Sequence, residues 1–88
     1  MNSKEFDCTG IIGKSPNPTL LSVRLYLDSD DDELTIYDNA LGPEYDTDIA
    51  YLNKEHPFID FGEEGYFCHK GLYAFLSRGG KFRVVWKN

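Results

Sequence analysis

Carboxylates are the side chains with the clearest chemical potential in this sequence of 88 residues. Nine Asp and Glu residues lie between Leu25 and Asn53, with no Lys or Arg among them. They are Asp28, Asp30, Asp31, Asp32, Glu33, Asp38, Glu44, Asp46 and Asp48. Two carboxylates that flank a substrate cleft can hydrolyse a glycosidic bond. A chain this short has a thin core with little room for a cleft, so we expect a protein that is not an enzyme.

The run Asp28-x-Asp30-x-Asp32 begins like the calcium-binding loop of an EF-hand. That loop requires glycine at its sixth position and glutamate at its twelfth, where this sequence has Glu33 and Asn39. The sequence therefore does not predict an EF-hand. A cation held by the acidic turn stays open as an alternative to a solvated loop.

Cysteine and histidine are the other candidate ligands and nucleophiles. Cys68 and His69 are adjacent, so on a strand their side chains point to opposite faces, which argues against a metal site or a Cys–His pair. Cys8 and His56 follow no metal-ligand spacing. We expect no metal and no cofactor. The two cysteines are predicted to be small buried residues, with a disulfide between them as the alternative.

Basic residues gather at the C-terminal end of the sequence. Residues 65–88 contain five Lys and Arg and no acid, together with Tyr73, Phe75 and Trp86. Such a mixture could neutralise phosphates and stack on bases. The net charge of −6, with −12 concentrated in residues 25–64, would repel a polyanion. We therefore expect no direct binding of nucleic acid.

Composition indicates one folded domain, residues 1–88. The chain is 41% apolar and 15% aromatic, which is too hydrophobic for intrinsic disorder. No apolar run approaches the roughly 18 residues of a membrane-spanning helix, and the first ten residues lack the apolar core of a signal peptide. We expect a protein of the bacterial or host-cell cytoplasm that does not contact membranes.

Period-two alternation predicts most of the elements that would position these side chains. Residues 19–28 and 33–38 alternate in this way and predict a hairpin that pairs Leu25 with Ile36 and places Asp30 and Asp31 at its tip. Residues 72–77 and 82–87 predict a second hairpin around Gly79-Gly80. Further strands are expected within residues 4–13, 57–61 and 66–70.

The predicted fold class is mainly β: a small antiparallel sandwich or barrel of five to six strands. Residues 46–55 are assigned to one short helix, because Asp46 or Thr47 could cap its N-terminus and acids favour that end. An ordered acidic loop is the alternative for this segment.

Uneven charge is the main clue to function. Residues 25–53 carry −9 and residues 65–88 carry +5, so the acidic region would attract a basic partner and steer its approach. Carboxylates on alternate strand positions would lie about 6.7 Å apart and could imitate a row of phosphates. The predicted partner-binding residues are Asp28, Asp30, Asp31, Asp32, Glu33, Glu44, Asp46 and Asp48, with Tyr45 and Tyr51 as anchors.

In size, charge and lack of catalytic motifs, the chain is similar to phage-encoded antagonists of host nucleases, such as anti-CRISPR or anti-restriction proteins, and to immunity proteins against nuclease toxins. The expected function is therefore a small acidic inhibitor that occludes the basic surface of a nucleic-acid-binding protein. The alternative is a structural or assembly module of a viral or bacterial complex, in which acidic and basic ends pair between copies. Neither reading specifies the oligomeric state.

Overall fold

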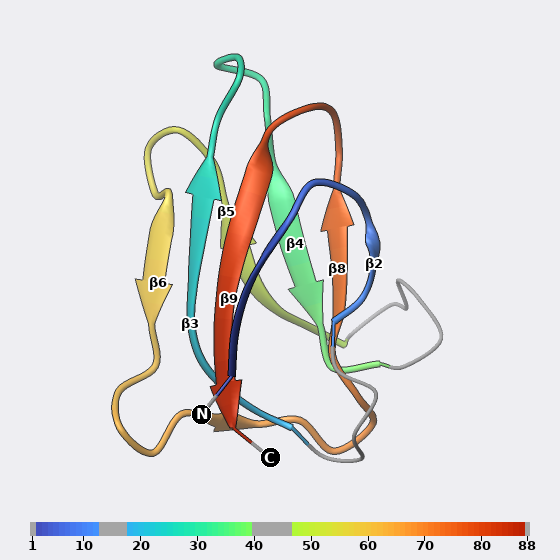
Figure 1. Ribbon diagram of the computed structural model, residues 1–88, viewed down its shortest axis with the longest axis vertical. Coiled ribbons are helices and arrows are strands. Elements are labelled where there is room, and N and C mark those ends of the chain that lie inside the picture. The colour runs from blue at the N-terminus through green and yellow to red at the C-terminus, as the bar shows by residue number, and fades with distance from the viewer. Residues whose placement is uncertain (1, 13–17, 40–46, 88) are drawn as a thin grey trace.

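Two antiparallel sheets pack face to face in the computed structural model, which describes residues 2–12, 18–39 and 47–87 (Figure 1). The five-stranded sheet has the order β1 (Asn2–Phe6), β9 (Lys81–Lys87), β3 (Thr19–Tyr26) and β6 (Phe58–Asp60), with β7 (Tyr66–Phe67) also beside β3. The four-stranded sheet has the order β2 (Gly10–Ile11), β8 (Tyr73–Leu76), β4 (Leu34–Tyr37) and β5 (Asp48–Leu52). The predicted β-sandwich is confirmed, with nine short strands over the described residues rather than five or six.

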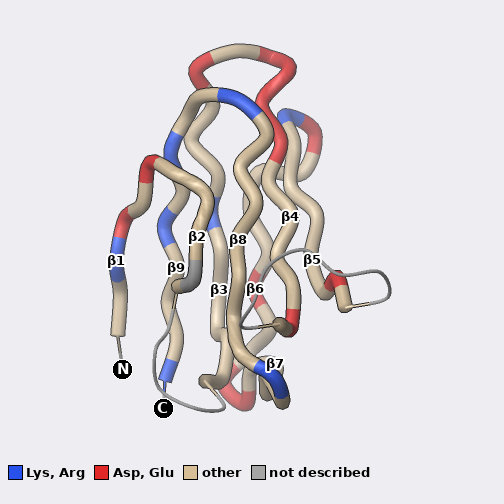
Figure 2. The backbone as a smooth tube through the Cα atoms, turned by 90° about the vertical axis from the view of Figure 1, so that its right-hand side faces the viewer, with Lys and Arg blue, Asp and Glu red and all other residues tan. Residues whose placement is uncertain are grey.

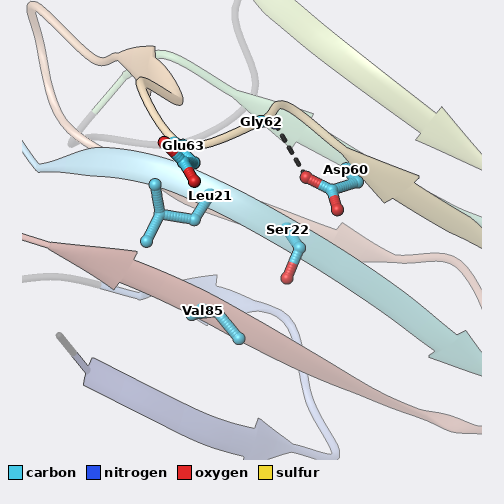
Figure 3. A pocket seen from close by; sticks show the side chains of 6 residues that line it. All are labelled: Leu21, Ser22, Asp60, Gly62, Glu63 and Val85. Carbon is cyan, nitrogen blue, oxygen red and sulfur yellow. Dashed lines mark hydrogen bonds between the residues drawn. The ribbon is translucent and has the colours of Figure 1, made fainter.

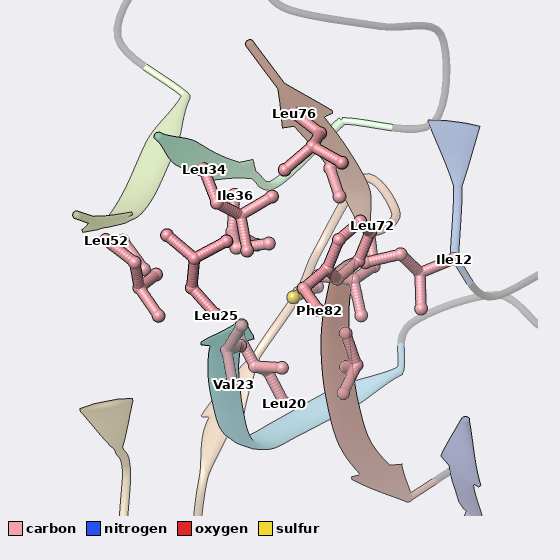
Figure 4. Packing of buried hydrophobic residues seen from close by; sticks show 14 residues of the cluster. Ile12, Leu20, Val23, Leu25, Leu34, Ile36, Leu52, Leu72, Leu76 and Phe82 are labelled. Carbon is pink, nitrogen blue, oxygen red and sulfur yellow. The ribbon is translucent and has the colours of Figure 1, made fainter. Parts of the chain in front are cut away.

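The core lies between the sheets and is built by the predicted alternation. In β4 the side chains of Leu34 and Ile36 are buried, whereas Thr35 and Tyr37, which alternate with them, are half-buried on the outer side. Val23 and Leu25 of β3 and Phe82 of β9 meet them from the opposite sheet (Figure 4). Burying a side chain of this kind contributes about 1.5–3 kcal/mol, so the alternation is the main source of stability.

The predicted hairpin between residues 19–28 and 33–38 is wrong. β3 pairs with β9, β6 and β7, and β4 pairs with β5 and β8, so the two segments belong to different sheets. Leu25 lies opposite Phe82, and Ile36 lies opposite Ala50 and Ala74. Alternation requires only that Leu25 and Ile36 face one core, and two strands that face each other across the core meet this requirement as well as a hairpin does.

The predicted C-terminal hairpin is wrong for the same reason. β8 pairs with β2 and β4, and β9 pairs with β1 and β3, so Gly79 and Gly80 connect the two sheets. Phe82 therefore points into the core, away from the outer side on which Phe75 lies. Gly80 has a φ of +91°, and a Cβ there would lie 2.8 Å from the carbonyl oxygen of Tyr26, so the crossing requires glycine at this point.

Residues 46–55 do not form the predicted helix: residue 46 is outside the described part, and Asp48–Leu52 is strand β5. Its Ala50 and Leu52 are buried while Tyr51 is exposed. The strand forms because of a tertiary contact, since β5 supplies the second hydrogen-bonding partner of β4.

The described part of the chain contains no helix that could cross a membrane.

The first predicted strand is two strands, β1 and β2, one in each sheet. Cys8 lies between them and is exposed, so the prediction that both cysteines are buried is correct only for Cys68. Both thiols are free. Burial, and secondarily the charge of Asp38, raises the pKa of Cys68 to about 12.

The strands predicted within residues 57–61 and 66–70 are present as β6 and β7.

Candidate protein-binding surface

Asp32 organises the acidic loop, residues 28–33, which joins β3 to β4. Its side chain is only 1% exposed and accepts hydrogen bonds from the backbone N–H groups of Asp28 (2.7 Å) and Ser29 (3.0 Å). The bond from Ser29 is the main reason that the pKa of Asp32 lies below its ordinary value. This carboxylate replaces the backbone partners that a hairpin ladder would have provided, and it is not accessible to another molecule.

Asp28 ties the acidic loop to the second connection at the same end of the sandwich. Its Oδ2 accepts a hydrogen bond of 3.1 Å from the backbone N–H of Gly80. A second link joins the same two connections, from the Ser77 backbone N–H to the Glu33 carbonyl oxygen at 3.0 Å. Asp28 and Asp32 therefore have structural roles, because their carboxylates accept hydrogen bonds from the backbone of the acidic loop and of the neighbouring connection.

Asp30 and Asp31 point into solvent, with side chains 87% and 74% exposed. Each lies 3.9 Å from a basic side chain, Lys54 Nζ for Asp30 and Arg78 Nη1 for Asp31. Exposed ion pairs of this length contribute little to stability and exchange readily for other partners. Figure 2 shows this mixture of acidic and basic residues at one end of the molecule, beyond the ends of β4 and β5.

Glu33 and Tyr51 connect the acidic loop to the outer side of the four-stranded sheet. Glu33 is exposed and immediately precedes β4. Tyr51 of β5 lies opposite Thr35 of β4. A hydrogen bond to the Glu33 carboxylate is the main cause that raises the pKa of the Tyr51 phenol. The phenol and the carboxylate are therefore adjacent polar groups at the edge of this sheet.

The outer side of the four-stranded sheet carries what we call the aromatic face: Tyr37, Tyr51, Tyr73 and Phe75. Thr35 lies between Phe75 and Tyr51 in the register, and the rings of Tyr37 and Tyr73 have centroids 6.5 Å apart. Tyr51 is 48% exposed and Phe75 is 42% exposed. Asp48 is the one charged residue in the four strands, so the middle of the sheet is uncharged (Figure 2). Aromatic side chains grouped in this way, half-buried at Tyr37 and Tyr73 and exposed at Tyr51 and Phe75, are typical of an interaction site.

The remaining predicted site residues lie elsewhere. Asp48 pairs with Tyr37 at the opposite end of β5 from the acidic loop, next to Asp38, whose carboxylate accepts hydrogen bonds from the backbone of His69 and Lys70. Glu44, Tyr45 and Asp46 lie outside the described residues. The structure thus brings together Asp30, Asp31, Glu33 and Tyr51. The predicted row of carboxylates on alternate strand positions is not formed by residues 28–33, which belong to a loop.

Sequence reasoning grouped Tyr73 with Phe75 but missed that Tyr37 lies on the same surface. All three occupy outward positions of alternating strands, which is a signal for exposure. Their grouping, however, depends on the pairing of β4 with β8, two strands almost 40 residues apart in the chain. Local alternation does not specify that pairing.

Within residues 2–12, 18–39 and 47–87, no group of three or more His, Cys, Asp or Glu side chains could hold a metal ion. No protein-family model matches the chain, and no curated protein or solved structure matches it either. The fold and the surface chemistry are therefore the basis for a functional proposal.

Proposed function

We propose that this protein is a protein-binding module that docks its aromatic face, together with Asp30, Asp31 and Glu33, onto a basic surface of a partner. The observation that carries the proposal is the aromatic face itself. Four aromatic side chains lie on the outer side of one sheet whose described strands carry a single charge, Asp48 beside Tyr37, and exposed carboxylates adjoin them at the other end.

Each part of this surface has a physical role in the proposed complex. Tyrosine and phenylalanine supply large apolar contact area with few rotatable bonds, which is why aromatic residues concentrate at the centres of interfaces. Arginine side chains of a partner can lie over the rings of Tyr51 and Phe75 and at the same time pair with Glu33. Asp30 and Asp31 would attract the partner from a distance.

A specific form of this function is inhibition by occlusion. A basic surface that normally holds nucleic acid would be covered by the aromatic face and the acidic loop, as in the phage-encoded antagonists and immunity proteins that the chain is similar to in character. One observation favours the alternative of an assembly module. The strands of the five-stranded sheet carry five basic and two acidic residues, so a second copy could supply the basic surface.

The test is affinity capture with three forms of the protein: wild type, Phe75→Ser and Phe58→Ser. Phe75 and Phe58 are both 42% exposed but lie on opposite outer sides of the sandwich, so the two substitutions remove equal side chains at equal exposure. We expect wild type and Phe58→Ser to retain the same basic, nucleic-acid-binding protein, and Phe75→Ser to lose it. Short duplex DNA should compete with capture.

Equal recovery by all three forms would contradict the proposal. Recovery that duplex DNA does not reduce would contradict the inhibitory form. Concentration-dependent sedimentation of the wild type alone, abolished by Phe75→Ser, would instead establish the assembly module.

A further inference from the structure

Two arginines lie side by side on the outer side of the five-stranded sheet. Arg24 of β3 is the direct register partner of Arg83 of β9, and both are exposed. Like charges in directly opposite positions destabilise a sheet. Arg83 is compensated by Glu5, whose Oε2 lies 3.3 Å from its Nη2. Among the described residues Arg24 has no carboxylate partner.

Arg24 is instead held in place by an aromatic ring. Its guanidinium carbon lies 4.4 Å from the ring centroid of Phe58, its register partner on β6. Stacking fixes the plane of the guanidinium and leaves its N–H groups at the edge free to donate. A pre-oriented arginine of this kind is well suited to bind a carboxylate with two parallel hydrogen bonds.

A shallow hollow of about 400 Å³ is lined by Ser22 and Val85, which form the register row next to that of the two arginines. Figure 3 shows the residues that line it. Leu21 and Val85 are its apolar lining residues, and Asp60 and Glu63 are its acidic ones. The backbone N–H of Gly62 donates to Asp60 at 2.7 Å. Leu21 is mostly buried, at 8% exposure, and lines the hollow from below. The hollow is therefore lined by both apolar and acidic side chains.

The strand register places three chemically different rows at equal spacing. Ser22 and Val85 form the row at the hollow, Arg24 and Arg83 form the next, and Tyr26 and Lys81 form the third. Successive rows are two residues apart along β3, a distance of about 6.7 Å. An extended peptide presents alternate side chains with the same repeat.

We propose that this outer side binds an extended acidic segment of a protein, in which one apolar residue is followed at alternate positions by two acidic residues. The apolar side chain occupies the hollow of Leu21 and Val85. The first carboxylate binds Arg24 and Arg83, and the second lies beside Lys81. Asp60 and Glu63 disfavour an acid at the hollow, so the order of the residues is specified. This proposal does not depend on the function proposed for the aromatic face.

A peptide fits the charge of this surface better than a nucleic acid does. Its rows contain three bases, and Glu5 lies within 3.9 Å of Lys81 as well as beside Arg83, so little net positive charge remains. The chain as a whole carries −6. Long polyanions would be repelled, whereas two carboxylates can be bound one at a time.

The test uses a fluorescein-labelled peptide of one leucine followed at alternate positions by two glutamates, with serine and glycine elsewhere. Fluorescence anisotropy measures its affinity for the wild type, for Arg24→Gln with Arg83→Gln, and for Arg78→Gln. Arg78 is an exposed arginine at the acidic loop, so its substitution is the matched control. We expect the double variant to bind at least about tenfold more weakly, and the control to bind like the wild type.

Three results would overturn the proposal. The first is no binding to the wild type at about 1 mM peptide, the weak limit of specific recognition. The second is equal affinity for a peptide in which the leucine and the glutamates exchange positions, so that an acid would lie at the hollow. The third is that a single-stranded oligonucleotide binds more tightly than the peptide and that its affinity depends on Arg24. This result would assign the surface to nucleic acid. Circular dichroism confirms that the double variant folds.

Discussion

The two outer sides of this sandwich differ in chemistry although one core supports both. Among the strands of the five-stranded sheet are Lys4, Arg24, Lys81, Arg83 and Lys87, against Glu5 and Asp60. The strands of the four-stranded sheet carry Asp48 and no other charge. On the outer side of the five-stranded sheet, the ring of Phe58 lies against the guanidinium of Arg24. On the outer side of the four-stranded sheet, the phenol of Tyr51 forms a hydrogen bond with the carboxylate of Glu33.

This contrast shows that net charge is a poor guide to a surface. The chain carries −6, yet neither sheet presents a row of acids, because the accessible carboxylates of the acidic loop lie at one end. We therefore propose different partners for the two surfaces: basic protein for the aromatic face and an acidic segment over Arg24 and Arg83.

The largest effect on stability is expected from a substitution in the core between the two sheets. Phe82 is fully buried, so Phe82→Ala should destabilise the protein by about 3–5 kcal/mol. Phe75→Ser on the exposed side should cost far less, because much of that ring is already in water. Denaturant unfolding of both variants measures the difference. Similar losses would mean that Phe75 belongs to the core.

The next effect concerns the acidic loop and its pH dependence. The pKa of Asp32 is lowered in the folded protein, so its contribution to stability is complete above the ordinary value of 3.8 and is lost as the pH falls through the lowered value. Asp32→Asn should lower the thermal midpoint at neutral pH and flatten the decline of that midpoint below about pH 4. Asp30→Asn, at an exposed position, is the control. An unchanged acid profile for Asp32→Asn would contradict this role.

A smaller effect is expected from the exposed charges. Asp30→Lys with Asp31→Lys should slow association with the proposed basic partner by about tenfold at low salt, and the difference should shrink as salt is added. Stopped-flow fluorescence measures the rates. Asp48→Lys, at the other end of β5, should leave the rate almost unchanged. A slower rate for Asp48→Lys as well would show that the partner covers the whole sheet.

The strands were predictable from sequence, but their pairing was not. Alternation around Leu25 and Ile36 correctly identifies which side chains enter the core, because burial follows the two-residue period. It does not distinguish two strands in one hairpin from two strands in opposite sheets. Gly79-Gly80 permits a tight turn, and the structure uses the same freedom to cross between sheets.

The binding surface was predictable only in part, for reasons of the same kind. The exposed acids Asp30 and Asp31 follow from composition and a turn. The burial of Asp32 depends on backbone N–H groups that the crossing leaves without ladder partners. The position of Phe75 beside Thr35 and Tyr51 requires the order of the strands in the sheet.

The central claim, that the two sides bind different molecules, is tested most directly by exchanging Phe75 and Phe58 for serine and measuring both ligands on both variants. We predict that Phe75→Ser loses the captured basic protein and keeps the acidic peptide, and that Phe58→Ser keeps the basic protein and weakens the peptide. Loss of both ligands, or of neither, in both variants would contradict the account.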